Sequence, residues 1–201
     1  MFRNDYSQAA SFLVETVQRI PDNAWKQPAL GAWNVRDLVG HATRALLTVE
    51  TYCETQAEAQ IVADPTDYFM RALGMLANHG ATDDRARETG LSLGNQPKAA
   101  VGEIADRVLK RLESIPDDFI LSPPTGGTRL SDYLPTRTLE MTVHTLDIAK
   151  AVGLEVQPPE GPLSSTLTLL ADLALRQGEG QHLALALTGR GPLLVGFSVM
   201  K

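Results

Sequence analysis

Arg137-Thr-Leu-Glu-Met-Thr-Val-His-Thr-Leu-Asp147 is the most informative stretch of this sequence. It contains no glycine or proline, and its apolar residues recur at helical spacing, which predicts a helix. Glu140 and His144 are four positions apart, so on a helix their side chains point the same way, about 40° apart. Such a carboxylate–imidazole pair can bind a divalent metal if a third ligand comes from another element, although the spacing also fits a surface ion pair.

A second histidine offers that third ligand. His41 lies in a segment that predicts a helix from Asn34 to about Ala63. Asn34 suits the N-cap position, and Asp37 falls where a carboxylate meets the positive end of the helix. Three other residues lie in line with His41 on the same face, namely Ala45, Thr48 and Tyr52. We therefore take His41 as the candidate partner of the glutamate–histidine pair.

The helical face that carries Glu140 holds further polar residues. Within about 60° of it lie Tyr133, Arg137, His144 and Asp147. Apolar residues border this face on both sides, which favours a groove or a bundle interior over a solvated surface. Asp147 either orients a ligand histidine by accepting its second N–H or is a surface carboxylate. Tyr133 and Arg137 are candidates to contact a substrate or thiol, with pairing to a nearby acid as the alternative for Arg137.

The rest of the chain predicts a mainly α protein. Helical spacing of apolar residues predicts four long helices, at residues 5–20, 34–63, 97–115 and 130–152. Between the second and third, residues 65–76 predict a short helix or a helical loop, and residues 78–84 predict a turn cluster. We therefore expect a four-helix bundle over residues 1–155.

The composition changes after Gly153. A proline-rich linker precedes a helix predicted at 163–176. Two short apolar runs, 182–187 and 193–199, flank a glycine- and proline-containing turn and predict a β-hairpin. Residues 156–201 are thus expected to form a short α+β extension, a helix plus a hairpin. An apolar hairpin can pair with a second copy, which makes a homodimer an open alternative.

Composition excludes several classes of function. The formal net charge is −6 and the pI about 5.2, and no basic stripe is present, which argues against nucleic acid as a partner. No run of about 18 apolar residues occurs, so no membrane span is expected. The single cysteine, Cys53, excludes an intrachain disulfide and fits the reducing cytoplasm.

Two segments together carry a family resemblance. Trp33-Asn-Val-Arg-Asp-Leu-Val-Gly-His41 and Glu140-Met-Thr-Val-His144-Thr-Leu-Asp147 resemble the metal-binding domain of mycothiol-dependent maleylpyruvate isomerase and its relatives, within the DinB-like four-helix-bundle metalloproteins. The resemblance covers residues 5–153. It implies that His41, Glu140 and His144 ligate a divalent metal, zinc in most relatives and with nickel as an alternative. It also implies mycothiol, a low-molecular-weight thiol, as co-substrate.

The ligand set leaves several chemistries open. Three N and O ligands leave one coordination position free, as in catalytic zinc sites. With a thiol there, the expected enzyme acts on an electrophilic substrate, as a maleylpyruvate-isomerase-like isomerase or a thiol S-transferase. A metal-dependent hydrolase that activates water is a second alternative. A non-catalytic or regulatory metal-binding bundle is the third. Cys53 lies about 18 Å from His41 along the same helix, so a fourth ligand role is not expected.

Overall fold

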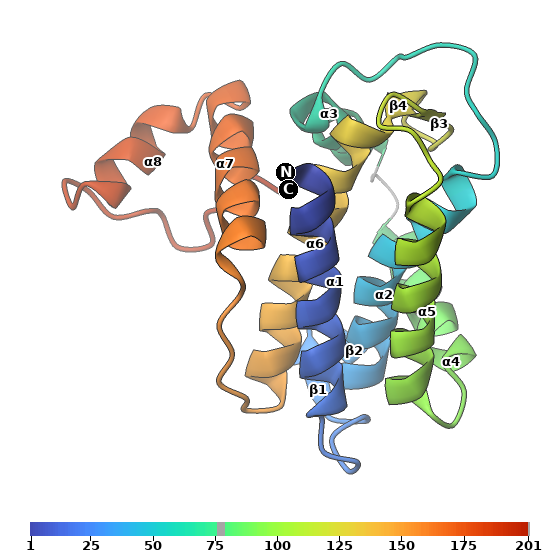
Figure 1. Ribbon diagram of the computed structural model, residues 1–201. Helices are drawn as coiled ribbons and strands as arrows, with labels where there is room; N and C mark the ends of the chain where they lie inside the picture. The colour runs from blue at the N-terminus through green and yellow to red at the C-terminus, as the bar shows by residue number, and fades with distance from the viewer. Residues whose placement is uncertain (76–78, 201) are drawn as a thin grey trace.

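Four long helices lie side by side in the structure, a computed structural model that describes residues 1–75 and 79–200, with the backbone alone described at 79–81 (Figure 1). They are α1 (Phe2–Gln18), α2 (Val35–Tyr52), α5 (Pro97–Leu112) and α6 (Leu130–Ala151). Helices α5 and α6 each pack against both α1 and α2. Their apolar stripes meet in one core, whose largest fully buried side chains include Tyr6, Leu13, Leu38, Leu46, Tyr133, Leu134, Met141 and Ile148.

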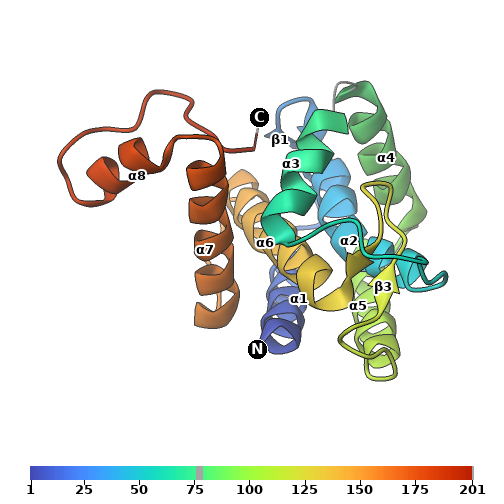
Figure 2. The same cartoon turned by 90° about the horizontal axis from the view of Figure 1, so that it is seen from above.

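Shorter elements complete the fold. Helix α3 (Pro65–Met75) lies at one end of α6, and α4 (His79–Ser92) packs along α2 (Figure 2). Two antiparallel strand pairs connect the helices: β1 (Pro28–Leu30) with β2 (Trp33–Asn34), and β3 (Ile120–Leu121) with β4 (Thr128–Arg129). The mainly α prediction is therefore confirmed. Among the described residues, no helix is both long and apolar enough to cross a membrane.

Helix α2 starts with the predicted capping pattern, but it ends earlier than predicted. Asp37 N–H donates to Asn34 Oδ1 at 3.0 Å, and Asn34 N–H donates to Asp37 Oδ2 at 3.2 Å, a complete capping box. The helix then ends at Tyr52 rather than near Ala63. Beyond it, backbone N–H groups bond to the β3–β4 segment instead, as Ala57 does to the carbonyl of Ile120 at 2.9 Å.

The predicted turn cluster at 78–84 is wrong from residue 79 onward, because these residues begin α4; Asn78 lies outside the described part of the chain. Backbone contact with α2 explains the difference. A Cβ atom built on Gly40 would lie 2.3 Å from Gly90 N, so the two glycines let the helix backbones touch. Arg36 adds side-chain hydrogen bonds to the carbonyls of Gly90, at 2.7 Å, and Gly94. Tertiary contact thus stabilises a helix with a weak apolar stripe.

The C-terminal extension is helical, so the predicted β-hairpin is wrong. Helix α7 (Glu160–Arg176) contains the helix predicted at 163–176 and packs on α6, α1 and α3. Residues 182–187 lie in a second helix, α8 (Gly180–Leu187), and residues 193–199 form no strand in the structure. The run of alternating leucine and alanine has the period of a strand, but both residues are strong helix formers. The expectation of a homodimer loses its basis with the hairpin.

Candidate metal centre

Three predicted ligand residues meet between two helices. His41 comes from α2, and Glu140 and His144 lie one turn apart on the face of α6 that packs toward α2. One donor atom from each lies within 4.8 Å of the other two. Glu140 Oε2 is 3.7 Å from His41 Nε2 and 3.3 Å from His144 Nε2. The three side chains are only 16–19% exposed, so they form a partly sheltered cluster rather than a surface ion pair.

These spacings fit the donor set of a divalent ion. A tetrahedral ion with ligands at about 2.0–2.1 Å separates its donor atoms by about 3.3–3.4 Å. The two measured separations, 3.3 and 3.7 Å, are close to that value. One carboxylate oxygen and two imidazole nitrogens are common zinc ligands, and three of them leave a coordination position free. The cluster can therefore hold a metal ion with little rearrangement.

Asp147 contacts one of the candidate ligands. Its Oδ2 lies 3.1 Å from His144 Nδ1. When Nδ1–H donates to Asp147, the lone pair of His144 is on Nε2, which faces Glu140. His41 is held differently, with its ring tilted by 34° against the ring of Trp33 at 4.6 Å and edge-on to His144 at 4.6 Å. Of the two roles predicted for Asp147, the structure therefore supports contact with a candidate ligand.

The electrostatics of the cluster favour a cation. Burial raises the pKa of Glu140, but hydrogen bonds to His144 and His41 outweigh this and hold the pKa well below its usual range. Burial lowers the pKa of His144, yet hydrogen bonds to Asp147 and Glu140 raise it to about 9. Burial dominates at His41 and lowers its pKa. Without an ion, the negative Glu140 is thus balanced by a proton on His144, which a divalent ion would displace.

A cavity of about 520 Å³ opens beside the cluster, with His41 and Glu140 in its wall. Tyr133 and Arg137 also line it, whereas Asp147 does not. The Tyr133 hydroxyl donates to Thr48 Oγ1 at 3.0 Å. The Arg137 guanidinium lies over the rings of Tyr68 and Tyr133, at 5.2 and 5.0 Å from their centroids. Among the described residues, no ion pair joins Arg137 to an acid.

Sequence reasoning missed several residues of this cavity. Thr48 and Tyr52 share the face of α2 that carries His41, a signal that the sequence contains. Tyr68 of α3 and Arg85 of α4 also line the cavity, but no pattern in the sequence places either helix there. Cys53 at the end of α2 is 5% exposed and belongs to the apolar core. Burial raises the pKa of its thiol to about 11.

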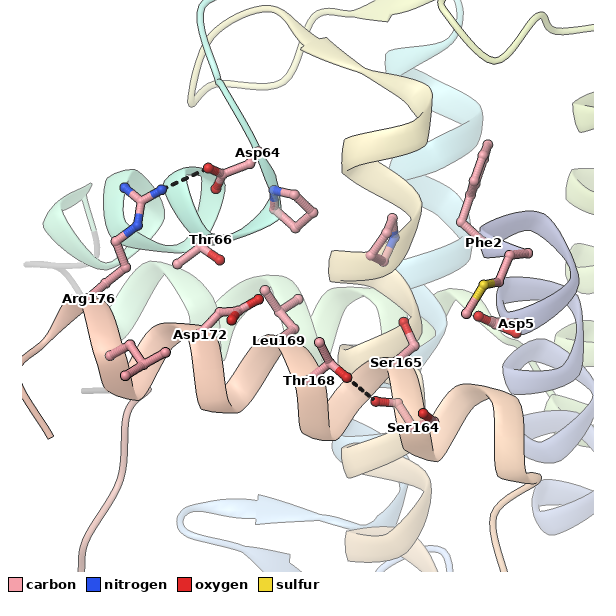
Figure 3. Close-up of a pocket in the computed structure, with 14 residues that line it drawn as sticks. Phe2, Asp5, Asp64, Thr66, Ser164, Ser165, Thr168, Leu169, Asp172 and Arg176 are labelled. Carbon is pink, nitrogen blue, oxygen red and sulfur yellow. Dashed lines mark hydrogen bonds and ion pairs between the residues drawn. The ribbon is translucent and has the colours of Figure 1, made fainter. Parts of the chain in front are cut away.

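A larger cavity of about 760 Å³ lies elsewhere, between α1, α3 and α7 (Figure 3). Asp64 and Arg176 form an ion pair at 2.7 Å in its wall. Asp5 of α1 and Ser164 of α7 lie at its other end. None of the three clustered residues lines this cavity, so it is separate from the candidate metal centre.

Fold and site together define a mainly helical protein with a carboxylate and two imidazoles placed to hold a metal ion. The family model of the mycothiol maleylpyruvate isomerase N-terminal domain matches residues 6–149. The chain belongs to this family, as its two sequence segments predicted. Membership implies metal binding and an involvement of mycothiol. No curated protein and no solved structure matches the chain.

Proposed function

We propose that this protein is a divalent-metal-dependent enzyme that uses mycothiol to act on an electrophilic substrate, as an isomerase or a thiol S-transferase. The observation that carries the proposal is the cluster of His41, Glu140 and His144 in the wall of a cavity of about 520 Å³. Family membership supports both the metal and the thiol. The cavity is large enough for a small substrate, since typical ligand pockets measure about 300–1,000 Å³.

The three clustered residues would hold the ion, with zinc as the first choice by ligand type and nickel as the second. When bound, the ion would lower the pKa of a thiol and so supply a thiolate at neutral pH. Asp147 keeps His144 in the tautomer that presents Nε2. Trp33 covers one face of His41 and limits its rotation.

Tyr133 and Arg137 act on the cavity side of the cluster. Both are substrate or thiol contacts in this proposal, because both residues line the cavity. The two tyrosine rings under Arg137 orient its guanidinium without neutralising it. The cation can therefore attract a negatively charged group on a ligand.

The proposal also covers the bundle fold and the boundary between two parts of the chain. We infer that α1, α2, α5 and α6 form the DinB-like four-helix bundle, with residues 1–155 as the metal-binding unit and 156–201 as an appended extension. The family match ends at residue 149, which supports a boundary near this point. A thiol co-substrate requires a reducing compartment, so we place the enzyme in the cytoplasm.

Metal content and cobalt spectroscopy test the proposal. Purified protein should carry about one divalent ion per chain, and a His41→Ala/His144→Ala double variant should carry almost none. His182→Ala is a matched control, because His182 is exposed on α8 and pairs with Glu179 at 2.8 Å. Equal metal content in the double variant and the wild type would refute the site.

Thiol use is tested on cobalt-substituted protein. Mycothiol should produce a sulfur-to-metal charge-transfer band in the near ultraviolet, and isomerase or transferase turnover should require the thiol. Ester or amide hydrolysis without added thiol, together with no such band, would favour a hydrolase instead. Neither band nor turnover would favour a regulatory metal-binding protein.

A further inference from the structure

Three guanidinium groups from three different helices line the cavity beside the cluster. They belong to Arg44 of α2, Arg85 of α4 and Arg137 of α6. Among the described residues, Glu140 supplies the one carboxylate in the cavity wall, and this carboxylate already contacts His41 and His144. The cavity therefore carries an excess of positive charge, although the chain as a whole has a net charge of −6.

Within the described residues, none of these three arginines forms an ion pair, whereas five other arginines do. Arg107 pairs with Glu50 at 2.7 Å and Arg3 with Asp117 at 2.5 Å. Within the described residues, no ion pair is formed by Arg44 or Arg85, and Arg85 donates to the hydroxyl of Thr82 at 3.1 Å. Burial, together with the neighbouring charge of Arg85, lowers the pKa of Arg44. With no carboxylate paired to either guanidinium among the described residues, both can bind a planar anion, which arginine holds through two parallel hydrogen bonds.

The walls of the cavity suit a planar ring. Aromatic side chains from four elements line it, namely Trp33 of β2, Tyr52 of α2, Tyr68 of α3 and Tyr133 of α6. Tyr133 packs edge-on against Tyr52 at 5.9 Å and Tyr68 at 5.4 Å, so these three rings form one contiguous aromatic group in the wall. Aromatic rings favour offset-stacked and edge-on contacts with one another. A ligand that combines a flat apolar ring with an anionic group matches both properties of the cavity.

We propose that the electrophilic substrate is an aromatic acid, and that Arg44 and Arg85 bind its carboxylate while the aromatic wall holds its ring. This rests on the proposed function for the thiol chemistry. The two arginines are specificity-determining residues, since they contact the substrate away from the reacting carbon. Gly40 and Gly90 bring the backbones of α2 and α4 together, which places Arg85 over the cavity that Arg44 lines from α2.

A chlorinated nitrobenzoate is a suitable reactive probe. In 4-chloro-3-nitrobenzoate, the sulfur of the thiol forms a bond to the ring carbon that carries chlorine. The carbon–chlorine bond breaks, chloride leaves with the bonding electron pair, and the thiol proton passes to solvent. No oxidant or reductant is needed, and the carboxylate is unchanged.

Binding is measured first, by calorimetry on metal-free protein with benzoate and its neutral analogue benzamide. Metal-free protein is used because a carboxylate has no ion to bind there. Benzoate should bind at least about tenfold more tightly than benzamide, and Arg85→Ala should weaken benzoate binding by about 10–100-fold, the range for hydrogen bonds to a charged group. Arg44→Ala should have a similar effect, and neither change should alter benzamide binding.

Arg87→Ala is the matched control. Arg87 lies two residues from Arg85 on α4, pairs with Asp84 at 3.4 Å and does not line the cavity, so its removal should leave benzoate affinity unchanged. Arg85→Lys should restore part of the affinity. Equal affinity for benzoate and benzamide, or benzoate binding that is unaffected by Arg85→Ala, would overturn the proposal. Arg85 is exposed, so its loss is not expected to prevent folding.

Two further measurements separate this inference from the proposed function. In zinc-loaded protein, the ratio of kcat/KM for 4-chloro-3-nitrobenzoate to that for the corresponding benzamide should fall at least about tenfold in Arg85→Ala, with zinc content unchanged. Selective benzoate binding without thiol turnover would support the anion site while refuting the enzyme. If mycothiol displaces benzoate, the arginines bind the thiol co-substrate instead. This result would overturn their role in binding the electrophilic substrate.

Discussion

Replacing Gly40 with alanine should destabilise the protein, although alanine is the better helix former. The new Cβ would lie 2.3 Å from Gly90 N, 2.6 Å from Ala86 O and 2.7 Å from Gly90 Cα. All three are backbone atoms, so α4 must move away from α2. Overpacking of this kind costs about 3 kcal/mol at the upper end of its usual range, against a gain of about 0.5–1 kcal/mol in helix propensity. The net loss is about 2 kcal/mol.

Thermal unfolding followed by circular dichroism measures this loss. In a protein of this size, about 2 kcal/mol corresponds to a decrease in Tm of roughly 4–8 °C. Gly102→Ala is the matched control, because Gly102 is also inside a helix but its Cβ would meet only Val14 Cγ1, at 4.0 Å. That variant should raise the Tm by roughly 1–4 °C. The reasoning is refuted if both substitutions raise the Tm.

Three more outcomes are expected. Chelation should lower the Tm by roughly 5–10 °C for an ion present at about a hundred times its Kd, with helicity retained; an unchanged Tm after confirmed metal removal contradicts an interhelical site. Asp147→Asn should keep the ion but weaken its binding by about 10–100-fold in a competition titration with a chromophoric chelator; unchanged affinity argues against contact with His144. The free energy of unfolding should fall between pH 9 and 11, and Cys53 should contribute up to about 3 kcal/mol of this fall. In this range the thiol of the unfolded chain ionises, while the buried thiol, with a pKa of about 11, stays neutral. Urea titrations at pH 8.5 and 10.5 should show a smaller fall in Cys53→Ala, and an equal fall assigns the loss to other groups.

Much of the cluster of His41, Glu140 and His144 is predictable from sequence, because it depends on residue spacing within single helices. Glu140 and His144 share a face through helical spacing alone, and the capping box at Asn34 sets the start of the helix that carries His41. A family resemblance was still needed to bring the two helices together. Periodicity specifies which face of a helix is buried, but not which other helix covers it.

The arginine side of the cavity could not be predicted for a related reason. Helix α4 has few buried apolar residues and depends on close contact between Gly40 and Gly90, so its sequence resembles a polar turn. Arg85 therefore had no assigned element. The error in the C-terminal extension is different, since alternation of leucine and alanine at 183–187 fits a strand by period and a helix by propensity. Among the described residues, no strand pairs with this segment, and the helix forms.

The division of the candidate ligands between two helices also sets when an ion could bind during folding. Helix α6 alone supplies Glu140 and His144, which is one ligand short of the cluster. His41 lies about 100 residues earlier in the chain, and closing so long a loop is entropically costly before the core has formed. The third ligand thus arrives only when α2 has docked. An ion held by all three residues would therefore bind only after α2 and α6 have packed together. Such an ion would slow unfolding more than it speeds folding.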